Sequence, residues 1–356
     1  IEMEPCLDRS WLSLRVNTSV TDGVTLEAEV KDSDGNVVAT GEGTSGTVFR
    51  LTLSSVHAWS PDDPYLYDLK LTAKKNGIVT DQVTSYCGMR KIEVHKDNRN
   101  LPRIYLNNEQ IFQMGPLDQG WWPDGLYMPA SDEAFYFDIK AMKNLGCNMI
   151  RKHIKIEPAR WYYWADHLSI LVWQDMPSPN LPQGYGDFAK TNFEEEVSHI
   201  IPAIKNAPSI VHWVVFNEGW GQFDTNRMTT FVDNKVNALT PARFGKASLI
   251  CCASGWTDSE IGNIIDTHSY PNPSCPQNAN RAAVCGEYGG ITLKVPGHIW
   301  PGGDFQYTVV ETSQDFTTFY NGLCDKIEDM YYQGLNAAVY TQLSDVEIEK
   351  NGFYTY

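Results

Sequence analysis

The stretch that decides the fold lies at residues 210–218 and has the sequence Ile-Val-His-Trp-Val-Val-Phe-Asn-Glu. It is a short apolar run that ends in two polar residues, Asn217 and Glu218. Runs of this kind, separated by stretches with helical spacing, predict parallel βα units. The strand candidates after residue 96 are 111–115, 148–152, 170–174, 210–216, 247–251, 264–268, 282–286 and 337–342. Strands and helices in this alternation predict a (β/α)₈ TIM barrel over residues 96–356.

Helix signals fill the gaps between these strands. Ser131 can cap a helix that has Asp132 in its first turn, and Gly146 can end it. Further helices are expected at residues 158–168, 193–205, 226–239 and 312–334. The chain stops at Tyr356, soon after the eighth strand, so the eighth helix is expected to be missing. Either the barrel leaves one strand uncovered or the chain continues beyond this sequence.

Residues 1–95 show a different pattern. Residues 24–31 alternate apolar and polar side chains without a break, which is typical of a half-buried strand. Asp34-Gly35 and Asn76-Gly77 are hairpin signals between such strands. Several short strands with turns between them predict an immunoglobulin-like β-sandwich. The whole chain is therefore expected to be a multidomain β and α/β protein.

The composition excludes several classes of protein. The 356 residues carry a net charge of −16, which argues against nucleic acid as a partner. No run of 18 apolar residues is present, so no membrane span is expected. The His and Cys residues do not pair at ligand spacing, which disfavours a metal site. Aromatic residues make up 12% of the chain, which fits either a large core or stacking on sugars.

The cysteines and the first residues bear on the compartment. An even count of eight cysteines fits a secreted protein with some disulfides, for example Cys275 with Cys285. The alternative is that the cysteines are buried free thiols. The sequence from Ile1 to Pro5 is neither an initiator nor a signal peptide, so the chain is expected to be processed or part of something longer. We expect an extracellular or secreted location.

Two glutamates follow barrel strands. Glu218 ends the fourth strand and Glu287 follows the seventh. Barrels of this kind carry their catalytic groups at the carboxyl ends of the strands. Glycoside hydrolysis needs one carboxylic acid to protonate the leaving oxygen and one carboxylate to attack the anomeric carbon. The pair therefore predicts a glycosidase, and the retaining mechanism requires a separation of about 5–5.5 Å.

Several motifs extend this interpretation. Residues 205–218 combine Asn-x-Pro-Ser-Ile, a Trp and a closing Asn-Glu, and residues 286–289 are Gly-Glu-Tyr-Gly. These motifs, with residues 58–67, 87–94 and 106–110, resemble glycoside hydrolase family 2, the β-galactosidase, β-glucuronidase and β-mannosidase group. The resemblance covers nearly the whole chain. It implies an immunoglobulin-like domain followed by a TIM barrel, without the family's N-terminal sugar-binding domain.

The resemblance also implies roles for individual residues. Glu218 matches the general acid/base and Glu287 the nucleophile. Asn217 is expected to hydrogen-bond the sugar 2-hydroxyl, Arg151 to support the nucleophile, and Tyr270 to orient or polarise it.

Other strand ends supply further candidates for substrate binding. Asp118 could bind sugar hydroxyls and Trp122 could stack on a sugar ring, although a loop packed by its own tryptophans is the alternative. His153, Asp175 and His268 complete the predicted set, with Asp175 equally suited to orienting its neighbours. The basic residues at 151–155 could receive a uronic acid carboxylate. Alternatively, Arg151 holds Glu287 while the lysines face outward.

Two functions of different classes follow. The first is a retaining exo-β-glycosidase that acts on an oligosaccharide or glycoside and needs no cofactor. The second is a non-catalytic carbohydrate-binding or structural protein, including a homo-oligomer or filament, built on the same barrel. The missing sugar-binding domain and eighth helix favour the second function, whereas the presence of both glutamates favours the first.

Overall fold

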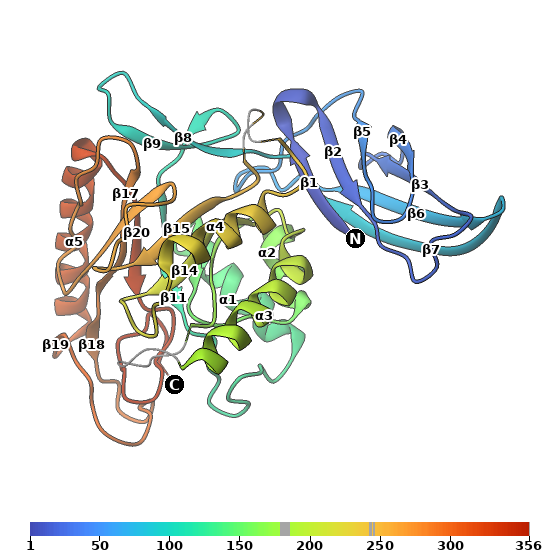
Figure 1. The fold of residues 1–356 in the computed structure, drawn as a ribbon. Helices are drawn as coiled ribbons and strands as arrows, with labels where there is room; N and C mark the ends of the chain where they lie inside the picture. The colour runs from blue at the N-terminus through green and yellow to red at the C-terminus, as the bar shows by residue number, and fades with distance from the viewer. Residues whose placement is uncertain (179–185, 242–243, 245, 356) are drawn as a thin grey trace.

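The structure is a computed structural model that describes residues 1–178, 186–241, 244 and 246–355. It has two parts, a β-sandwich at the N-terminal end and a barrel flanked by helices (Figure 1). This arrangement confirms the predicted fold class.

The sandwich consists of two antiparallel sheets that enclose one apolar core. Strand β3 (Val24–Lys31) alternates buried side chains with exposed or partly exposed ones along its length, as its sequence predicts. At the β6–β7 turn, Asn76 and Gly77 have φ values of 51° and 81°, the backbone that a two-residue hairpin needs. One sheet comprises β1 (Glu2–Cys6), β2 (Trp11–Arg15) and β5 (Val48–Thr52); the other comprises β4 (Val37–Gly43), β3 (Val24–Lys31), β6 (Tyr67–Lys75) and β7 (Ile78–Cys87).

A small sheet closes the amino-terminal end of the barrel. It is formed by β8 (Ile92–Lys96), β9 (Pro102–Leu106) and β10 (Glu109–Gln110). Buried side chains of β8 and β9 join one apolar cluster with the inward side chains of the barrel strands. Asn336, at the start of the last barrel strand, bonds to the backbone of Ile104 and Pro102. The opposite end, where the strands finish, is the end available for a site.

All eight predicted barrel strands are confirmed. Neighbours in chain order pair in parallel, apart from the fifth and sixth strands, and the first strand also pairs with the eighth. Between the fifth and sixth strands, Asn263 completes the ring: its N–H donates to the Ile250 carbonyl at 2.8 Å, and its Oδ1 accepts from the Ile250 N–H at 3.0 Å. The strands are β11 (Gln113–Asp118), β12 (Met149–Lys152), β13 (Leu171–Asp175), β14 (Ile210–Asn217), β15 (Leu249–Ser254), β16 (Ile264–Ser269), β17 (Ala282–Gly289) and β20 (Leu335–Thr341).

The helices differ from a regular barrel. They are α1 (Asp132–Asn144), α2 (Ala159–Leu168), α3 (Asp187–Ile204), α4 (Thr225–Val236) and α5 (Ser313–Gln333). The two connections at residues 255–263 and 270–281 are fully described and carry no α-helix, so the expectation of helices between all strands is wrong there. Two short strands, β18 (Ile291–Leu293) and β19 (Thr308–Val310), precede α5. No helix follows β20 within residues 342–355.

Buried polar contacts join the sandwich to the barrel. The carboxylate of Asp166 in α2 accepts from the Tyr86 hydroxyl at 2.7 Å and from the Ser209 N–H at 2.9 Å. Trp59 Nε1 donates to the Asp166 carbonyl at 2.9 Å. Glu4 of β1 accepts three backbone N–H groups at residues 238–240. Burying these charged groups requires such partners, so the two domains are firmly joined.

Two further findings concern the cysteines and the membrane. All eight cysteines are free in the structure, which corrects the expected disulfides and supports the alternative of free thiols. Cys275 and Cys285 are not bonded to each other. Among the residues that the structure describes, no helix has the length and apolar character needed to span a bilayer.

Candidate active site

A pocket of about 330 Å³ opens at the carboxyl ends of the barrel strands. Several of the predicted site residues line it: His153, Asn217, Glu218, Tyr270 and Glu287. The other lining residues are Leu117, Gln119, Trp121, Tyr127, Ile154, Trp220, Tyr307, Thr341 and Glu349.

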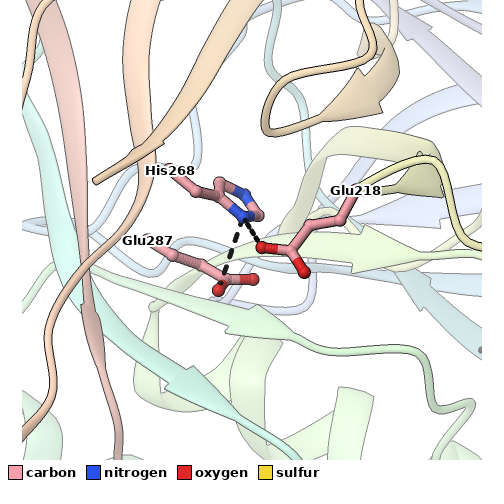
Figure 2. A group of neighbouring side chains, drawn as sticks. All are labelled: Glu218, His268 and Glu287. Atoms are coloured by element: carbon pink, nitrogen blue, oxygen red, sulfur yellow. Dashed lines mark hydrogen bonds and ion pairs between the residues drawn. The ribbon is translucent and has the colours of Figure 1, made fainter. Parts of the chain in front are cut away.

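The two predicted catalytic glutamates converge in this pocket with His268 between them. Nδ1 of His268 lies 2.6 Å from Oε1 of Glu218 and 3.4 Å from Oε2 of Glu287. Figure 2 shows how the three side chains point toward one another. One ligand atom from each of the three side chains lies within 4.8 Å of the others. The carboxyl groups are therefore close to the separation that a covalent glycosyl intermediate requires, about 5–5.5 Å.

The backbone turns sharply to direct Glu218 into the pocket. Glu218 has a φ of 54°, in the left-handed region that few non-glycine residues adopt. Its N–H donates to the Ser254 carbonyl at 2.8 Å, which ties the turn to the next strand. Trp220 Nε1 lies 3.3 Å from the second carboxylate oxygen, Oε2. Both carboxylate oxygens of Glu218 thus have a positioned partner.

Arg151 at the end of β12 supports the second glutamate. Its side chain is fully buried, and its Nη1 lies 3.1 Å from Oε1 of Glu287. The same guanidinium forms a fork with Asp175, with contacts of 3.1 and 2.9 Å, and donates to Asn217 Oδ1 at 2.8 Å. Arg151 therefore contacts Glu287 directly, which is the geometry that one of the two interpretations of the basic residues requires. Asp175 orients this arginine and lies beneath the pocket rather than in its lining.

The charges around Glu287 determine its protonation state. Burial alone would raise the pKa of Glu287, but the charges of His268 and Arg151 outweigh burial and lower it. Asp175 is similar, because Arg151 and His153 lower its pKa despite complete burial. Nδ1 of His153 lies 3.0 Å from Asp175 Oδ2. Glu287 is therefore held as a carboxylate.

His268 is part of a buried hydrogen-bonded chain. Its Nε2 lies 2.7 Å from Ser254 Oγ, which donates to Asp266 Oδ2 at 2.5 Å. Burial lowers the pKa of His268, but the nearby carboxylates of Glu287, Glu218 and Asp266 together raise it above its usual value. The imidazole therefore favours its charged form and lies beneath the pocket lining, where it contacts the two glutamates.

Tyr270 contacts Glu287 from the other side. Its hydroxyl donates to Glu287 Oε2 at 2.7 Å and lies 2.7 Å from Thr341 Oγ1. Its ring stacks on Tyr307 with 3.7 Å between centroids. Burial, followed by the Glu287 charge, raises the pKa of the Tyr270 hydroxyl, so it remains a proton donor in this hydrogen bond.

The basic residues next to Arg151 do not face the solvent. Lys152 Nζ pairs with Asp118 and lies 2.9 Å from Glu157, while Lys155 Nζ lies 3.0 Å from Glu157. The expectation that these lysines face outward is wrong, because both are buried in this ion-pair cluster. Asp118 also accepts from the Gly120 N–H at 2.7 Å and lies outside the pocket lining.

The tryptophan that lines the pocket is the neighbour of the one that the sequence suggested for stacking on a sugar ring. Trp122 lies outside the pocket lining and packs against the core between the barrel and its helices. Trp121 lines the pocket instead and meets Tyr127 edge to face, with 4.5 Å between centroids. The alternation of side chains along an irregular loop has no fixed period, so the sequence alone could not distinguish the two tryptophans.

Sequence reasoning missed several lining residues. Trp220 is only two positions after Glu218 in the sequence, and this closeness could have indicated that it lines the pocket. Tyr307 and Glu349 lie in segments without regular periodicity. The sequence there contained no signal that these residues line the pocket. Burial, followed by the charge of Glu287, raises the pKa of Glu349.

Glu218, His268 and Glu287 also lie close enough to be considered as metal ligands. In the structure the three side chains contact one another directly, with Nδ1 of His268 2.6 Å from Glu218 and 3.4 Å from Glu287.

The chain thus combines an immunoglobulin-like sandwich with an eight-stranded parallel barrel that carries two glutamates at its mouth. The model of the family described as Glycosyl hydrolases family 2 matches residues 9–90. Over these residues the chain is similar to this family.

Curated relatives and solved structures are also similar to this chain. The β-galactosidase large subunit of Leuconostoc lactis is 28% identical over 246 residues, which cover 61% of this chain and 37% of the relative. A putative β-glucuronidase of Formosa agariphila is 26% identical, covering 67% of this chain and 28% of the relative. The chain thus spans little more than a third of the first relative's length and less of the second's.

The solved structure of the FMN-binding β-glucuronidase from Facaelibacterium prausnitzii L2-6 matches with a TM-score of 0.75 and 19% identity, over 99% of this chain and 57% of that one. A β-glucuronidase from Ruminococcus gnavus, solved with C6-substituted uronic isofagomine, also gives 0.75, at 16% identity, over 96% of this chain and 62% of that one. These similarities support the fold.

Proposed function

We propose that this chain carries the active site of a retaining exo-β-glycosidase, which removes a terminal β-linked sugar. The observation that carries the proposal is the pair Glu218 and Glu287, whose carboxylate oxygens approach within 4.8 Å in one pocket. Retaining glycosidases need their two carboxyl groups about 5–5.5 Å apart, whereas inverting enzymes need about 6.5–9.5 Å to admit a water. The short separation supports retention.

In the first step, Glu287 is the nucleophile. Its carboxylate attacks the anomeric carbon while the glycosidic bond breaks, and Glu218 donates a proton to the leaving oxygen. Arg151 and Tyr270 hold the two oxygens of Glu287 at 3.1 and 2.7 Å. These contacts keep the nucleophile ionised and fix its direction of attack.

In the second step, water releases the sugar. Glu218, now a carboxylate, takes a proton from the water as the water oxygen adds to the anomeric carbon and the ester to Glu287 breaks. Both glutamates return to their first states, so the reaction needs no cofactor. Asn217 lines the same pocket and is held by Arg151, which suits it to bind the sugar 2-hydroxyl.

The size of the pocket supports exo action. A volume of about 330 Å³ is at the small end for ligand sites and suits a single sugar ring. The loops that follow β11 and β20 line one part of the pocket, and the residues after β14 line another. A terminal sugar fits such a pocket, whereas the interior of a long polysaccharide needs an open groove.

A non-catalytic role is not favoured. A barrel that only binds carbohydrate has no need for a buried arginine and a tyrosine on one of its two glutamates. An extracellular location is a separate proposal, and fractionation of the source cells tests it. Self-assembly into oligomers is another, and size measurement on the natural protein tests it.

The test is turnover of a panel of aryl β-glycosides by wild-type protein and by Glu287→Gln. We expect loss of at least about 10⁴-fold in kcat for this variant, since no covalent intermediate can form. Glu218→Ala is expected to be partly rescued by azide, which needs no general base. Glu347→Gln, on an exposed residue outside the pocket, is the matched control. Unchanged turnover in Glu287→Gln contradicts the proposal.

A further inference from the structure

We propose that Glu349 makes this pocket selective for sugars that carry no acid group, so that neutral glycosides are substrates and uronides are rejected. This inference rests on the proposed glycosidase function and names its substrate class. It differs from what the names of several relatives suggest, since those proteins are described as β-glucuronidases.

Glu349 is held firmly in the pocket by the segment that follows β20. Its backbone exchanges two hydrogen bonds with Val346, both of 2.9 Å. Its Oε2 accepts from Gln119 Nε2 at 3.1 Å and from Gln342 Nε2 at 3.0 Å. The two glutamines are themselves joined at 3.0 Å. The carboxylate therefore has a fixed position.

The second oxygen of Glu349 remains available to a ligand. Within the part of the chain that the structure describes, Oε1 makes no hydrogen bond, and the residue lines the pocket and is only partly exposed. A carboxylate oxygen accepts hydrogen bonds from sugar hydroxyls, and bonds to a charged acceptor are stronger than neutral ones. Glu349 can thus hold a hydroxyl group of a neutral sugar.

The charges of the pocket work against an acidic sugar. Three glutamates line it, Glu218, Glu287 and Glu349, and among the described lining residues there is no lysine or arginine. A uronate would add its own negative charge to a partly buried space that already holds these acidic side chains. Like charges at short distance in a site of reduced dielectric repel strongly, so the uronate is disfavoured.

The nearby cations are already engaged. Arg151 is fully buried beneath the pocket and contacts Asp175, Asn217 and Glu287. Lys152 and Lys155 belong to the ion-pair cluster with Asp118 and Glu157.

Two other basic groups lie close to the pocket. Lys350, next to Glu349 in the chain, lies 2.7 Å from Asp304. His153 is the one histidine of the lining, and its Nδ1 lies 3.0 Å from Asp175. Neither offers an unpaired positive charge to a uronate.

The experiment uses pairs of substrates that differ only at C6. We compare kcat/KM at pH 7.5 for the 4-nitrophenyl β-glucoside and β-glucuronide, and for the β-galactoside and β-galacturonide. In wild-type protein we expect each neutral substrate to be preferred by at least about 100-fold over its uronide. In Glu349→Gln, which keeps the size of the side chain, we expect the preference to shrink at least about tenfold, mainly through KM.

Glu347→Gln is the matched control, since Glu347 is exposed on the same segment and outside the pocket; its preference should equal that of wild type. Thermal unfolding of each variant verifies that it folds. A uronide cleaved as well as its neutral partner by wild-type protein overturns the inference. A preference that Glu349→Gln leaves unchanged overturns it as well.

A binding measurement separates this inference from the proposed function. Calorimetry with isofagomine and with its uronic analogue measures selectivity without turnover. The inference is supported if wild-type protein binds isofagomine more tightly than its uronic analogue and if this difference in affinity is smaller in Glu349→Gln. This holds even if no glycoside of the panel is cleaved. Equal or tighter binding of the uronic analogue to wild-type protein contradicts it, whatever the turnover.

Discussion

Nδ1 of His268 lies 2.6 Å from Oε1 of Glu218, so the proposed acid/base is paired with a buried imidazole. The same Nδ1 lies 3.4 Å from the proposed nucleophile, Glu287. One histidine therefore influences both carboxylates. Its effect on Glu287 is to lower the pKa, as a positive charge stabilises the ionised form.

Replacing His268 should shift the pH dependence of the reaction. In His268→Gln the positive charge is gone, so the pKa of Glu287 rises and the acid limb of kcat/KM moves to higher pH. We also expect kcat/KM at neutral pH to fall about 10–100-fold. The pH profile of kcat/KM measures both effects. His199→Gln, on an exposed residue of α3, is the control, and an acid limb at the wild-type position in His268→Gln contradicts the prediction.

Arg151→Lys should damage both activity and stability. A lysine has no planar fork, so it cannot bind Asp175 through two nitrogens while contacting Glu287 and Asn217. We expect kcat/KM to fall at least about 100-fold and the free energy of unfolding to fall by about 2 kcal/mol. Arg160→Lys disturbs an exposed pair with Asp132 and should leave the free energy of unfolding nearly unchanged. Equal effects of the two substitutions would argue against the role of Arg151.

Tyr270→Phe should slow turnover without unfolding the site. The phenylalanine ring keeps the stacking on Tyr307 but loses the donor to Glu287 Oε2. We expect kcat to fall about 10–100-fold, with thermal stability within a few degrees of wild type. Stopped-flow measurement of the burst and of the steady state shows which step slows. Wild-type rates for both steps would exclude a role of this hydroxyl in the reaction.

The free energy of unfolding should depend on pH through Asp166, which lies at the contact between the two domains. Complete burial raises the pKa of this carboxyl from 3.8 to about 7. Because the pKa in the folded state is the higher one, its stabilising contribution is present below about pH 4 and is lost as the pH rises through 7. Wild-type protein should therefore lose stability relative to Asp166→Asn by up to about 1.4 kcal/mol per pH unit across this window. Urea unfolding at pH 4, 5.5, 7 and 8 measures this difference, and parallel curves would contradict it.

The sequence predicted the barrel strands well for a physical reason. Strands buried on both sides must be apolar throughout, and their ends are marked by the first polar residues, as at Asn217 and Glu218. Because all carboxyl ends meet at one mouth, Glu218 and Glu287 could be paired from the sequence alone.

Other features depend on tertiary packing, which no local pattern reveals. Lys152 and Lys155 are typical surface residues by composition, and only the fold brings Asp118 and Glu157 to them. The general alternation of strands and helices also did not reveal that residues 255–263 and 270–281 connect their strands without an α-helix. Glu349 went unnoticed because its segment has no periodicity.

The segment at residues 342–355 separates the proposed determinant of substrate specificity from the proposed reaction centre. The atoms proposed to make and break bonds belong to strand ends braced by the whole barrel, whereas the carboxylate proposed to discriminate between sugars belongs to a compact appendage with its own internal hydrogen bonds. Substrate choice can therefore be altered by exchanging this one segment between related barrels, with the chemistry left in place. Such an exchange offers a route by which proteins with the same reaction centre acquire different substrate specificities.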